Sequence, residues 1–263
     1  MANNQQVSSY TIVLPTVYGD VLVNRFDKNQ TDALVKTGAG FDRQKIVVAE
    51  HICRQAQRGA LMLDVGANFG LFALACARAL QPLDGAVHAW EGQRMLSYMI
   101  AGSAALNSLE NLFVYHACVG NSTDPVPIPR FDYFQPMNFG SVEFGATQLE
   151  SLDQKRQVST ESVQQVRLDD LSLENVCLMK IDVEGMEETV LDGCVETIER
   201  SRPIVLIEYL KSDASQLAEF FRERKYVVHV YNGDFLCIPR GQTINGLNNA
   251  LPEYVPGTKM ERI

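Results

Sequence analysis

The sequence predicts an α/β fold: a seven-stranded, mostly parallel sheet with a reversed last strand and helices on both faces. From residue 60 onward, short apolar runs alternate with helical segments, which is typical of βαβ units and a parallel sheet. Asn232-Gly233 separates two strand-like runs near the end of the chain and indicates an antiparallel hairpin. The 263 residues, 46% of them hydrophobic, suit one large domain with smaller additions.

Residues 1–57 are expected to form a β/α cover over this sheet. Short strands are predicted at 10–14 and 21–23, because a Tyr-Gly-Asp turn separates two apolar runs. Residues 41–55 carry apolar side chains at helical spacing and predict an amphipathic helix.

The main domain is expected to span residues 58–241. Its first half predicts strands at 60–65, 85–91 and 111–119, with helices at 69–80 and 94–106. Its second half predicts a helical turn at 167–171, strands at 176–182, 204–208, 226–231 and 235–239, a helix at 186–193 and another around Leu217, Phe220 and Phe221. Right-handed crossovers would place these helices on the two sheet faces.

Residues 121–166 interrupt the alternation with a segment rich in Ser, Thr, Pro, Gln and Gly. Long irregular stretches inside a compact domain usually serve function, so we expect a β-rich insertion over the substrate side. Residues 242–263 are expected to form a C-terminal tail.

Composition and charge exclude several classes of protein. The net charge of −9 disfavours nucleic-acid binding. No apolar run approaches the roughly 20 residues of a membrane span, and the polar start of the chain lacks a secretory signal. The six cysteines form no CxxC pair and sit mostly in apolar segments, which indicates buried thiols in a reducing compartment. We therefore expect a cytoplasmic protein without a membrane span.

The segment 64–70 (DVGANFG) follows a predicted strand and opens a helix. Glycines there let a ligand approach the backbone, and the helix start offers unpaired N–H groups. A dinucleotide site would need GxGxxG, but Asn68 and Leu71 stand where the second and third glycines belong. An NAD-linked oxidoreductase therefore remains an alternative that these two residues disfavour.

Two carboxylates are predicted at the tips of consecutive strands. Asp64 would repel a diphosphate but attract a cation, and Glu91 is placed to take both hydroxyls of a ribose. Each residue alone has a simpler explanation, a helix cap for Asp64 and a solvated strand end for Glu91. Occurring in order, they favour a ligand with a ribose, no phosphate and a positive centre, which describes S-adenosyl-L-methionine.

At these positions the sequence resembles the class I, or Rossmann-like, methyltransferases and, more narrowly, the FkbM-type family. The resemblance runs from about residue 21 to 238 and is clearest in three motifs: 63–70 (LDVGANFG), 88–91 (HAWE), and 167–171 (RLDDL) followed by 180–185 (KIDVEG). It implies methyl transfer, often to a hydroxyl of a glycan or small natural product. The sequence departs from the family at Gly92-Gln93, where proline is common, and at Asn121, where an acid is common.

The residues expected to bind the methyl donor are Asp64, Gly66, Ala67, Asn68, Gly70, Glu91, Gly92, Cys118, Val119 and Asp182. The expected partner is a small-molecule or glycan acceptor, with no nucleic acid, and nothing in the sequence specifies an oligomeric state. A donor-binding scaffold without chemistry is the non-enzymatic alternative.

A hydroxyl acceptor needs a general base or a metal. Asp182, Glu184 and Glu208 are the catalytic candidates, because they follow strands whose carboxyl ends form the ligand-binding edge of such sheets. Asp182 and Glu184 are also residue types that cap helices. No metal site is assigned, although a variant in which these three carboxylates hold Mg²⁺ stays open.

Aromatic residues allow two interpretations. Tyr133, Phe134, Phe139 and Phe144 would either line an acceptor cleft or anchor the insertion to the body. His88 and His116 fall within strands and are expected to be packed rather than catalytic. Trp90 is expected in the core or in the wall of the adenosine pocket.

Overall fold

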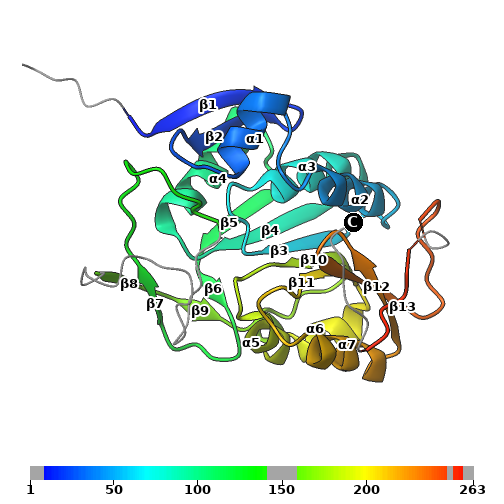
Figure 1. Ribbon diagram of the computed structural model, residues 1–263. Helices are drawn as coiled ribbons and strands as arrows, with labels where there is room; N and C mark the ends of the chain where they lie inside the picture. The colour runs from blue at the N-terminus through cyan, green and yellow to red at the C-terminus, as the bar shows by residue number, and fades with distance from the viewer. Residues whose placement is uncertain (1–8, 141–158, 248–250, 257–263) are drawn as a thin grey trace, which may run out of the picture.

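The computed structural model describes residues 9–140, 159–247 and 251–256. Its centre is the predicted seven-stranded sheet, with helices on both faces (Figure 1). The strands are β3 (Leu61–Val65), β4 (Ala86–Glu91), β5 (Leu112–His116), β10 (Val176–Ile181), β11 (Ile204–Glu208), β12 (Tyr226–Tyr231) and β13 (Asp234–Pro239).

The strand order is β12-β13-β11-β10-β3-β4-β5. β13 pairs antiparallel with both β11 and β12, and the pairs among β11, β10, β3, β4 and β5 are parallel. The reversed last strand is thus confirmed, and it inserts between β11 and β12.

The helices form two layers. One face carries α1 (Gln30–Thr37), α2 (Arg43–Arg54), α3 (Leu71–Leu80), which continues into the short helix η1 (Gln81–Leu83), and α4 (Arg94–Leu106). The other carries α5 (Glu187–Asp192), α6 (Val195–Ser201) and α7 (Ala214–Glu223), with the short helix η2 (Leu168–Leu171) beside α6.

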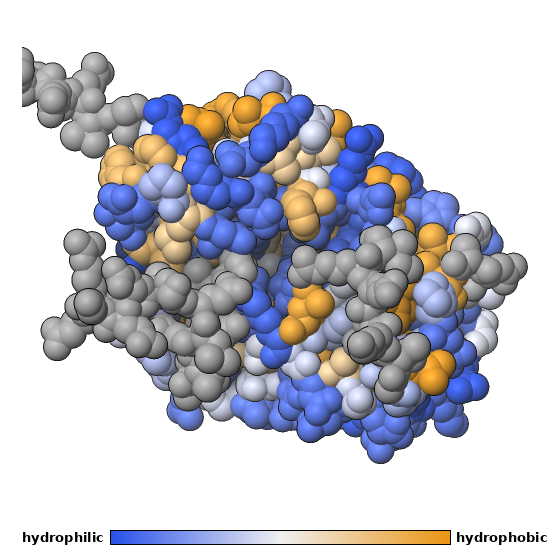
Figure 2. Space-filling model, in the orientation of Figure 1, coloured by the Kyte–Doolittle hydropathy of each residue, from blue (hydrophilic) through white to orange (hydrophobic). Residues whose placement is uncertain are grey.

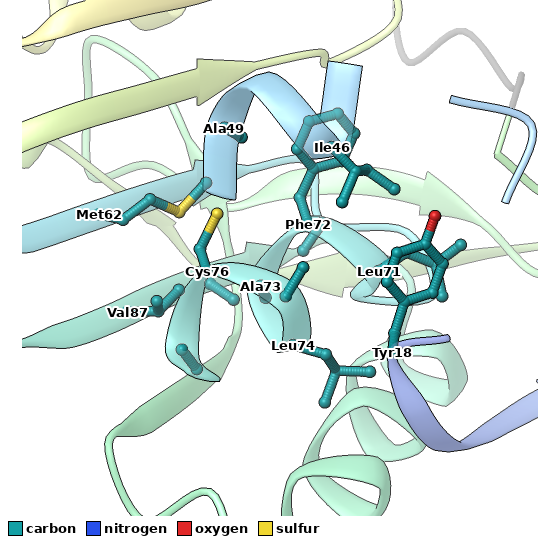
Figure 3. Close-up of a cluster of buried hydrophobic side chains, with 14 of the residues drawn as sticks. Tyr18, Ile46, Ala49, Met62, Leu71, Phe72, Ala73, Leu74, Cys76 and Val87 are labelled. Carbon is teal, nitrogen blue, oxygen red and sulfur yellow. The ribbon is translucent and has the colours of Figure 1, made fainter. Parts of the chain in front are cut away.

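The helix α3 is buried on all sides except at Arg78. Its sequence is apolar all round, which suits a helix enclosed between other elements. Figure 3 shows its residues packed between Met62 and Val87 of the sheet and Tyr18 and Ile46 of the N-terminal segment. This packing anchors the start of α3, and with it the glycine loop.

The N-terminal segment forms the hairpin of β1 (Thr11–Thr16) and β2 (Gly19–Asn24), as expected, and then α1 and α2. α1 was not predicted from the sequence. Leu22 donates its backbone N–H to Ser103 Oγ at 2.9 Å, which ties the hairpin to α4. The domain limits at residues 57 and 241 stay predictions.

The expected strand at 111–119 is wrong as one unit. It divides at Ala117 into β5 and β6 (Cys118–Val119), because β6 leaves the main sheet to pair with β9 (Gln165–Val166). Within the insertion, β7 (Val126–Pro129) pairs antiparallel with β8 (Thr160–Val163), as a hairpin excursion requires. Residues 141–158, which include most of the predicted β-like patch and Phe144, lie outside the described residues.

α6 is a second helix that was not predicted from the sequence. Its first N–H groups, from Glu196 and Thr197, donate to the Asp169 carboxylate at 3.2 and 2.8 Å. The capping residue therefore comes from η2, far from the helix start in the sequence, so no local pattern marked the helix.

None of the helices in the described ranges combines the length and hydropathy that crossing a bilayer requires. Hydrophilic residues predominate on the face shown in Figure 2, with smaller apolar patches between them.

Candidate functional site

A cleft opens at the carboxyl ends of β3, β4 and β10. It is partly open to solvent and holds about 610 Å³ when the open space at its mouth is included. Its lining is Val65, Gly66, Asn68, Trp90, Glu91, Gly92, Gln93, Leu96, Ala117, Cys118, Val119, Gly140, Asp182, Val183, Glu184 and Met186.

Most of the predicted donor-binding residues reach this cleft. Those in the lining are Gly66, Asn68, Glu91, Gly92, Cys118, Val119 and Asp182. Asp64 in β3 and Ala67 and Gly70 in the loop after it are buried and are not part of the lining. Their direct contact with a donor stays a prediction.

Gly66 holds the loop after β3 close to β10. Its φ is +77°, and a Cβ there would lie 1.9 Å from the carbonyl oxygen of Asp182. The N–H groups of Gly66 and Ala67 both donate to the carbonyl of Trp90 at 3.0 Å. The loop is therefore clamped between β4 and β10, and only glycine fits the position.

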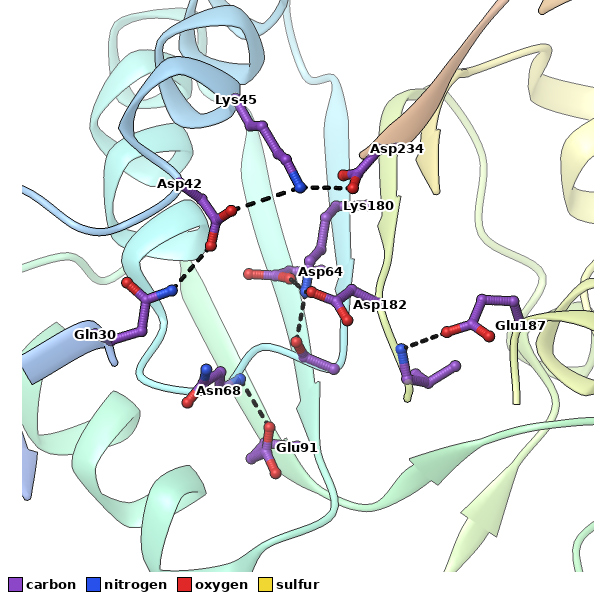
Figure 4. Close-up of polar contacts among 12 residues, drawn as sticks. Gln30, Asp42, Lys45, Asp64, Asn68, Glu91, Lys180, Asp182, Glu187 and Asp234 are labelled. Atoms are coloured by element: carbon purple, nitrogen blue, oxygen red, sulfur yellow. Dashed lines mark hydrogen bonds and ion pairs between the residues drawn. The ribbon is translucent and has the colours of Figure 1, made fainter. Parts of the chain in front are cut away.

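Glu91 points into the cleft from the end of β4. Its Oε2 accepts the N–H of Asn68 at 2.7 Å (Figure 4). Its Oε1 accepts the N–H of Gln93 at 2.8 Å. Burial raises the pKa of Glu91 to about 7, although both N–H donors act to lower it. Each carboxylate oxygen keeps a lone pair, so this fixed acceptor can still receive two hydroxyl donors.

Lys180 lies beneath the glycine loop. It is the direct cross-strand partner of Asp64, and its Nζ is 3.6 Å from both Asp64 Oδ1 and Asp182 Oδ2. It also donates to the carbonyl of Gly66 at 2.5 Å. Burial opposes the charge, but Asp182 and Asp64 together outweigh it and raise the pKa of Lys180.

Asp64 is fully buried and faces Lys180 rather than the cleft. The structure therefore does not bring its carboxylate to the surface where a ligand would lie. Lys180 lies within the 180–185 motif, but nothing in the local sequence assigns it this role. Its pairing with Asp64 spans 116 positions of the chain and depends on strand register.

The three catalytic candidates gather at the edge of β10 and β11. Asp182 and Glu184 line the cleft, and Glu208 ends β11 beside them. Glu184 has a φ of +58°, a strained conformation that is common at functional sites, and its carboxylate contacts Lys211. Glu208 Oε2 is buried without a hydrogen-bond partner among the described residues.

Burial and mutual repulsion raise the pKa values of two of these carboxylates to near neutral pH. Burial, then Asp182, raises the pKa of Glu184 to about 7, and Lys211 acts against this. Burial, then Asp182 and Glu184, raises the pKa of Glu208 to about 8. Carboxylates perturbed in this way suit proton transfer near neutral pH.

The N-terminal segment contributes a charge to the same edge. Lys45 of α2 lies 2.5 Å from Asp234 and 3.5 Å from Asp42, which also accepts a hydrogen bond from Gln30 (Figure 4). Asp234 is the cross-strand partner of Glu208. Lys45 and Asp234 were not predicted from the sequence, since no local pattern links α2 to β13.

The segment of the insertion at Phe139 and Gly140 is fixed beside the cleft. Gln93 donates to the carbonyl of Phe139 at 2.6 Å, and Gly140 packs against the side chain of Asn68. Phe139 is fully buried and stacks on Tyr133 at 5.2 Å. Of the two readings of the insertion aromatics, these two residues fit the anchoring one.

Among the residues that the structure describes, no group of three His, Cys, Asp or Glu side chains is arranged to hold a metal ion. The described carboxylates therefore offer no ready ligand set for the Mg²⁺ variant that the sequence left open.

A model of the methyltransferase FkbM domain family matches residues 64–228 of the chain. The match covers the glycine loop, Glu91 and all three catalytic candidates. No curated protein matches the chain.

Solved structures similar to the chain include three methyltransferases. The methyltransferase FkbM from Methylobacillus flagellatus KT is 16% identical with a TM-score of 0.46, over 70% of this chain and 44% of that one. The precorrin-6y C5,15-methyltransferase from Geobacter metallireducens GS-15 is 15% identical with a TM-score of 0.42, over 72% and 74%. A SAM dependent methyltransferase from Aquifex aeolicus is 12% identical with a TM-score of 0.41, over 80% and 94%. The chain thus spans less than half the length of the first of these.

Proposed function

The chain belongs to the FkbM methyltransferase domain family, and from this premise we propose that it transfers a methyl group from S-adenosyl-L-methionine to a hydroxyl of a glycan or small natural product. The observation that carries the proposal is Glu91, a buried carboxylate held in the cleft by two N–H groups with acceptor capacity to spare. A ribose offers two adjacent hydroxyl donors that match it.

The other groups of the cleft fit the same donor. Asn68 Oδ1 is buried without a hydrogen-bond partner among the described residues, and Asp182 adds a partly exposed carboxylate. These oxygens form an acceptor-rich surface that suits a cationic ligand and disfavours a diphosphate. When bound, S-adenosyl-L-methionine supplies a methyl group activated by its sulfonium. The chain's part is to bind and orient it.

Glu184 and Glu208 support a hydroxyl as the acceptor. A hydroxyl loses its proton only to a positioned base, and the raised pKa values of about 7 and 8 make these carboxylates able to hold that proton. Glu184 lines the cleft and is the first candidate to receive it. Glu208 lies behind it, with an unpartnered oxygen available to share the proton.

Calorimetry with S-adenosylhomocysteine and with NAD⁺ tests the donor site. We expect the first to bind, the second not to bind, and Glu91→Ala to lose binding. Glu110→Ala, which removes an exposed acid outside the cleft, is the matched control. Binding of NAD⁺ alone would overturn the assignment.

Transfer of labelled methyl from S-adenosyl-L-methionine to purified glycans and polyhydroxylated natural products tests the chemistry. Product NMR distinguishes a methyl ether from a methylamine. We expect a methyl ether, and a lower kcat in Glu184→Gln. Donor binding without any transfer across the acceptor panel would favour the scaffold alternative.

A further inference from the structure

The two edges of the main sheet differ. The β12 edge is closed by the chain itself, because Val230 donates to the carbonyl of Pro252 at 3.0 Å and Tyr254 donates to that of Val228 at 2.8 Å. At the other end, β5 pairs only with β4 within the described residues. An open edge presents unpaired N–H and C=O groups, which form a template for another strand.

The residues of β5 do nothing to discourage such pairing. Leu112–His116 contains no Lys, Arg, Asp, Glu or Pro, the residues that proteins usually place on exposed edges. Phe113 and Tyr115 are 47% and 37% exposed. Both are fixed by stacking, Phe113 on His88 at 5.1 Å and Tyr115 on Trp90 at 5.2 Å. The edge is therefore flanked by a rigid aromatic wall.

The helix α4, which packs on β5, is also apolar on its outer face. No charged residue occurs between Met95 and Leu106. Tyr98, Ala101 and Ala105 share one face at helical spacing and are exposed. A surface helix normally turns charged residues to water, so this face is typical of a covered helix. Its alanines also allow another helix to approach closely.

We propose that a second copy of this chain docks on this edge, with β5 antiparallel to β5 of the partner and α4 facing α4. We call the exposed residues Tyr98, Ala101, Ala105, Leu106, Phe113 and Tyr115 the β5 edge surface. Antiparallel pairing of one strand with its own copy is self-complementary, as a twofold interface requires.

Charge favours a second copy as the occupant. With a net charge of −9, two copies repel wherever their acidic surfaces meet, and the β5 edge surface carries no charge. Antiparallel pairing centred on Val114 sets Leu112–His116 of one copy opposite the same residues of the other, and none of these residues is a Lys, Arg, Asp or Glu. No like charges therefore meet along the paired strands.

Light scattering and sedimentation equilibrium on the full chain test the proposal. We expect twice the mass of one chain for the wild type, and monomers for Phe113→Glu and for Ala101→Glu. Val47→Glu, on the exposed side of α2, is the matched control and is expected to stay dimeric. Melting curves and S-adenosylhomocysteine binding establish that each variant is folded.

A double variant tests the orientation. Antiparallel pairing centred on Val114 sets position 113 of one copy opposite position 115 of the other. Phe113→Glu combined with Tyr115→Lys should therefore restore the dimer, and a folded double variant that stays monomeric would overturn the strand pairing. A monomeric wild type at all concentrations, or a dimer that both glutamates leave intact, would overturn the interface.

Discussion

Two opposing effects act on the Glu91 carboxylate: burial disfavours its charge, and a pair of N–H donors favours it. With a pKa of about 7, it is partly protonated near neutral pH. Ribose hydroxyls donate to the ionised form, so affinity for S-adenosylhomocysteine should fall as the pH drops below about 7. Calorimetry across this pH range in several buffers measures the effect.

The matched variant is Glu91→Gln, which keeps the shape and removes the titration. We expect affinity to fall roughly tenfold to a hundredfold, the equivalent of about 1.5–3 kcal/mol for hydrogen bonds to a charged group. The pH dependence should flatten at the same time. A wild-type affinity that is constant across the titration range would contradict this role for Glu91.

Lys180 is predicted to stabilise the fold around the cleft. Lys180→Met leaves the Asp64 carboxylate buried without its counter-ion, which typically costs about 3–5 kcal/mol of unfolding free energy. Lys180→Met combined with Asp64→Asn should recover part of this loss, because the fully buried carboxylate is removed together with its counter-ion. Urea denaturation of the four proteins of this cycle measures it, and additive losses would contradict the pairing.

At the residue scale, the sequence predicted Glu91 in the cleft but misjudged the surroundings of Asp64. Both residues belong to strands that end at the same edge. Asp64 precedes the last residue of its strand and turns toward Lys180 on β10, whereas Glu91 ends its strand and turns to the cleft. This difference depends on strand register and side-chain direction, neither of which a motif contains.

The loop between β3 and α3 is the element whose geometry is most constrained. Gly66→Ala should destabilise the protein by more than the roughly 1–2 kcal/mol of left-handed strain, because the new methyl group also meets the backbone of β10. Gly38→Ala is the control, since Gly38 has a similar φ of +71° and nothing near its Cβ position.

Thermal unfolding and S-adenosylhomocysteine binding distinguish the two variants. We expect Gly38→Ala to lose modest stability and keep binding, and Gly66→Ala to lose both. Equal losses in the two variants would show that strain alone, and not the clamp on Asp182, sets the role of Gly66.

The sequence predicted the core strands well because each is an apolar run bounded by polar or turn residues. The elements it missed depend on distant partners. The short helix α1 begins where the Asp27 carboxylate accepts the N–H groups of Asn29 and Thr31, and Asp27 also accepts that of Phe139 from the insertion. α6 similarly depends on Asp169 of η2 for its cap.

At the scale of the molecule, the cleft edge joins charges from several parts of the chain. Asp182 and Glu184 follow β10, Glu208 ends β11, and Asp234 begins β13 with Lys45 of α2 against it. Sequence order separates these groups widely, so only the sheet topology brings them together. A site of this kind concentrates like charges at a cost in stability.

That cost should appear in the pH dependence of unfolding. The pKa of Glu208 is about 8 in the folded protein, against an ordinary value of 4.5, so the folded state holds a proton that the unfolded state releases. The stabilisation that protonated Glu208 gives the folded state is fully present below about pH 4.5, and it is lost as the pH rises through about 8.

Glu208→Gln removes the titrating group and keeps its size. Its melting temperature should match the wild type near pH 4.5 and exceed it increasingly toward pH 8, and calorimetric scans measure the difference. A variant that is less stable than the wild type at pH 8 would contradict the assignment. A lower kcat in the same variant would show that the Glu208 carboxylate, which destabilises the fold when it is ionised, serves the reaction.

Trp90 is the only tryptophan of the chain, and it lies in the lining of the cleft next to Glu91. The tryptophan fluorescence of this protein therefore reports on one place alone, the wall of the proposed donor pocket. Ligand entry can be followed in real time by emission quenching without an attached dye, and stopped-flow traces would separate the order in which donor and acceptor arrive.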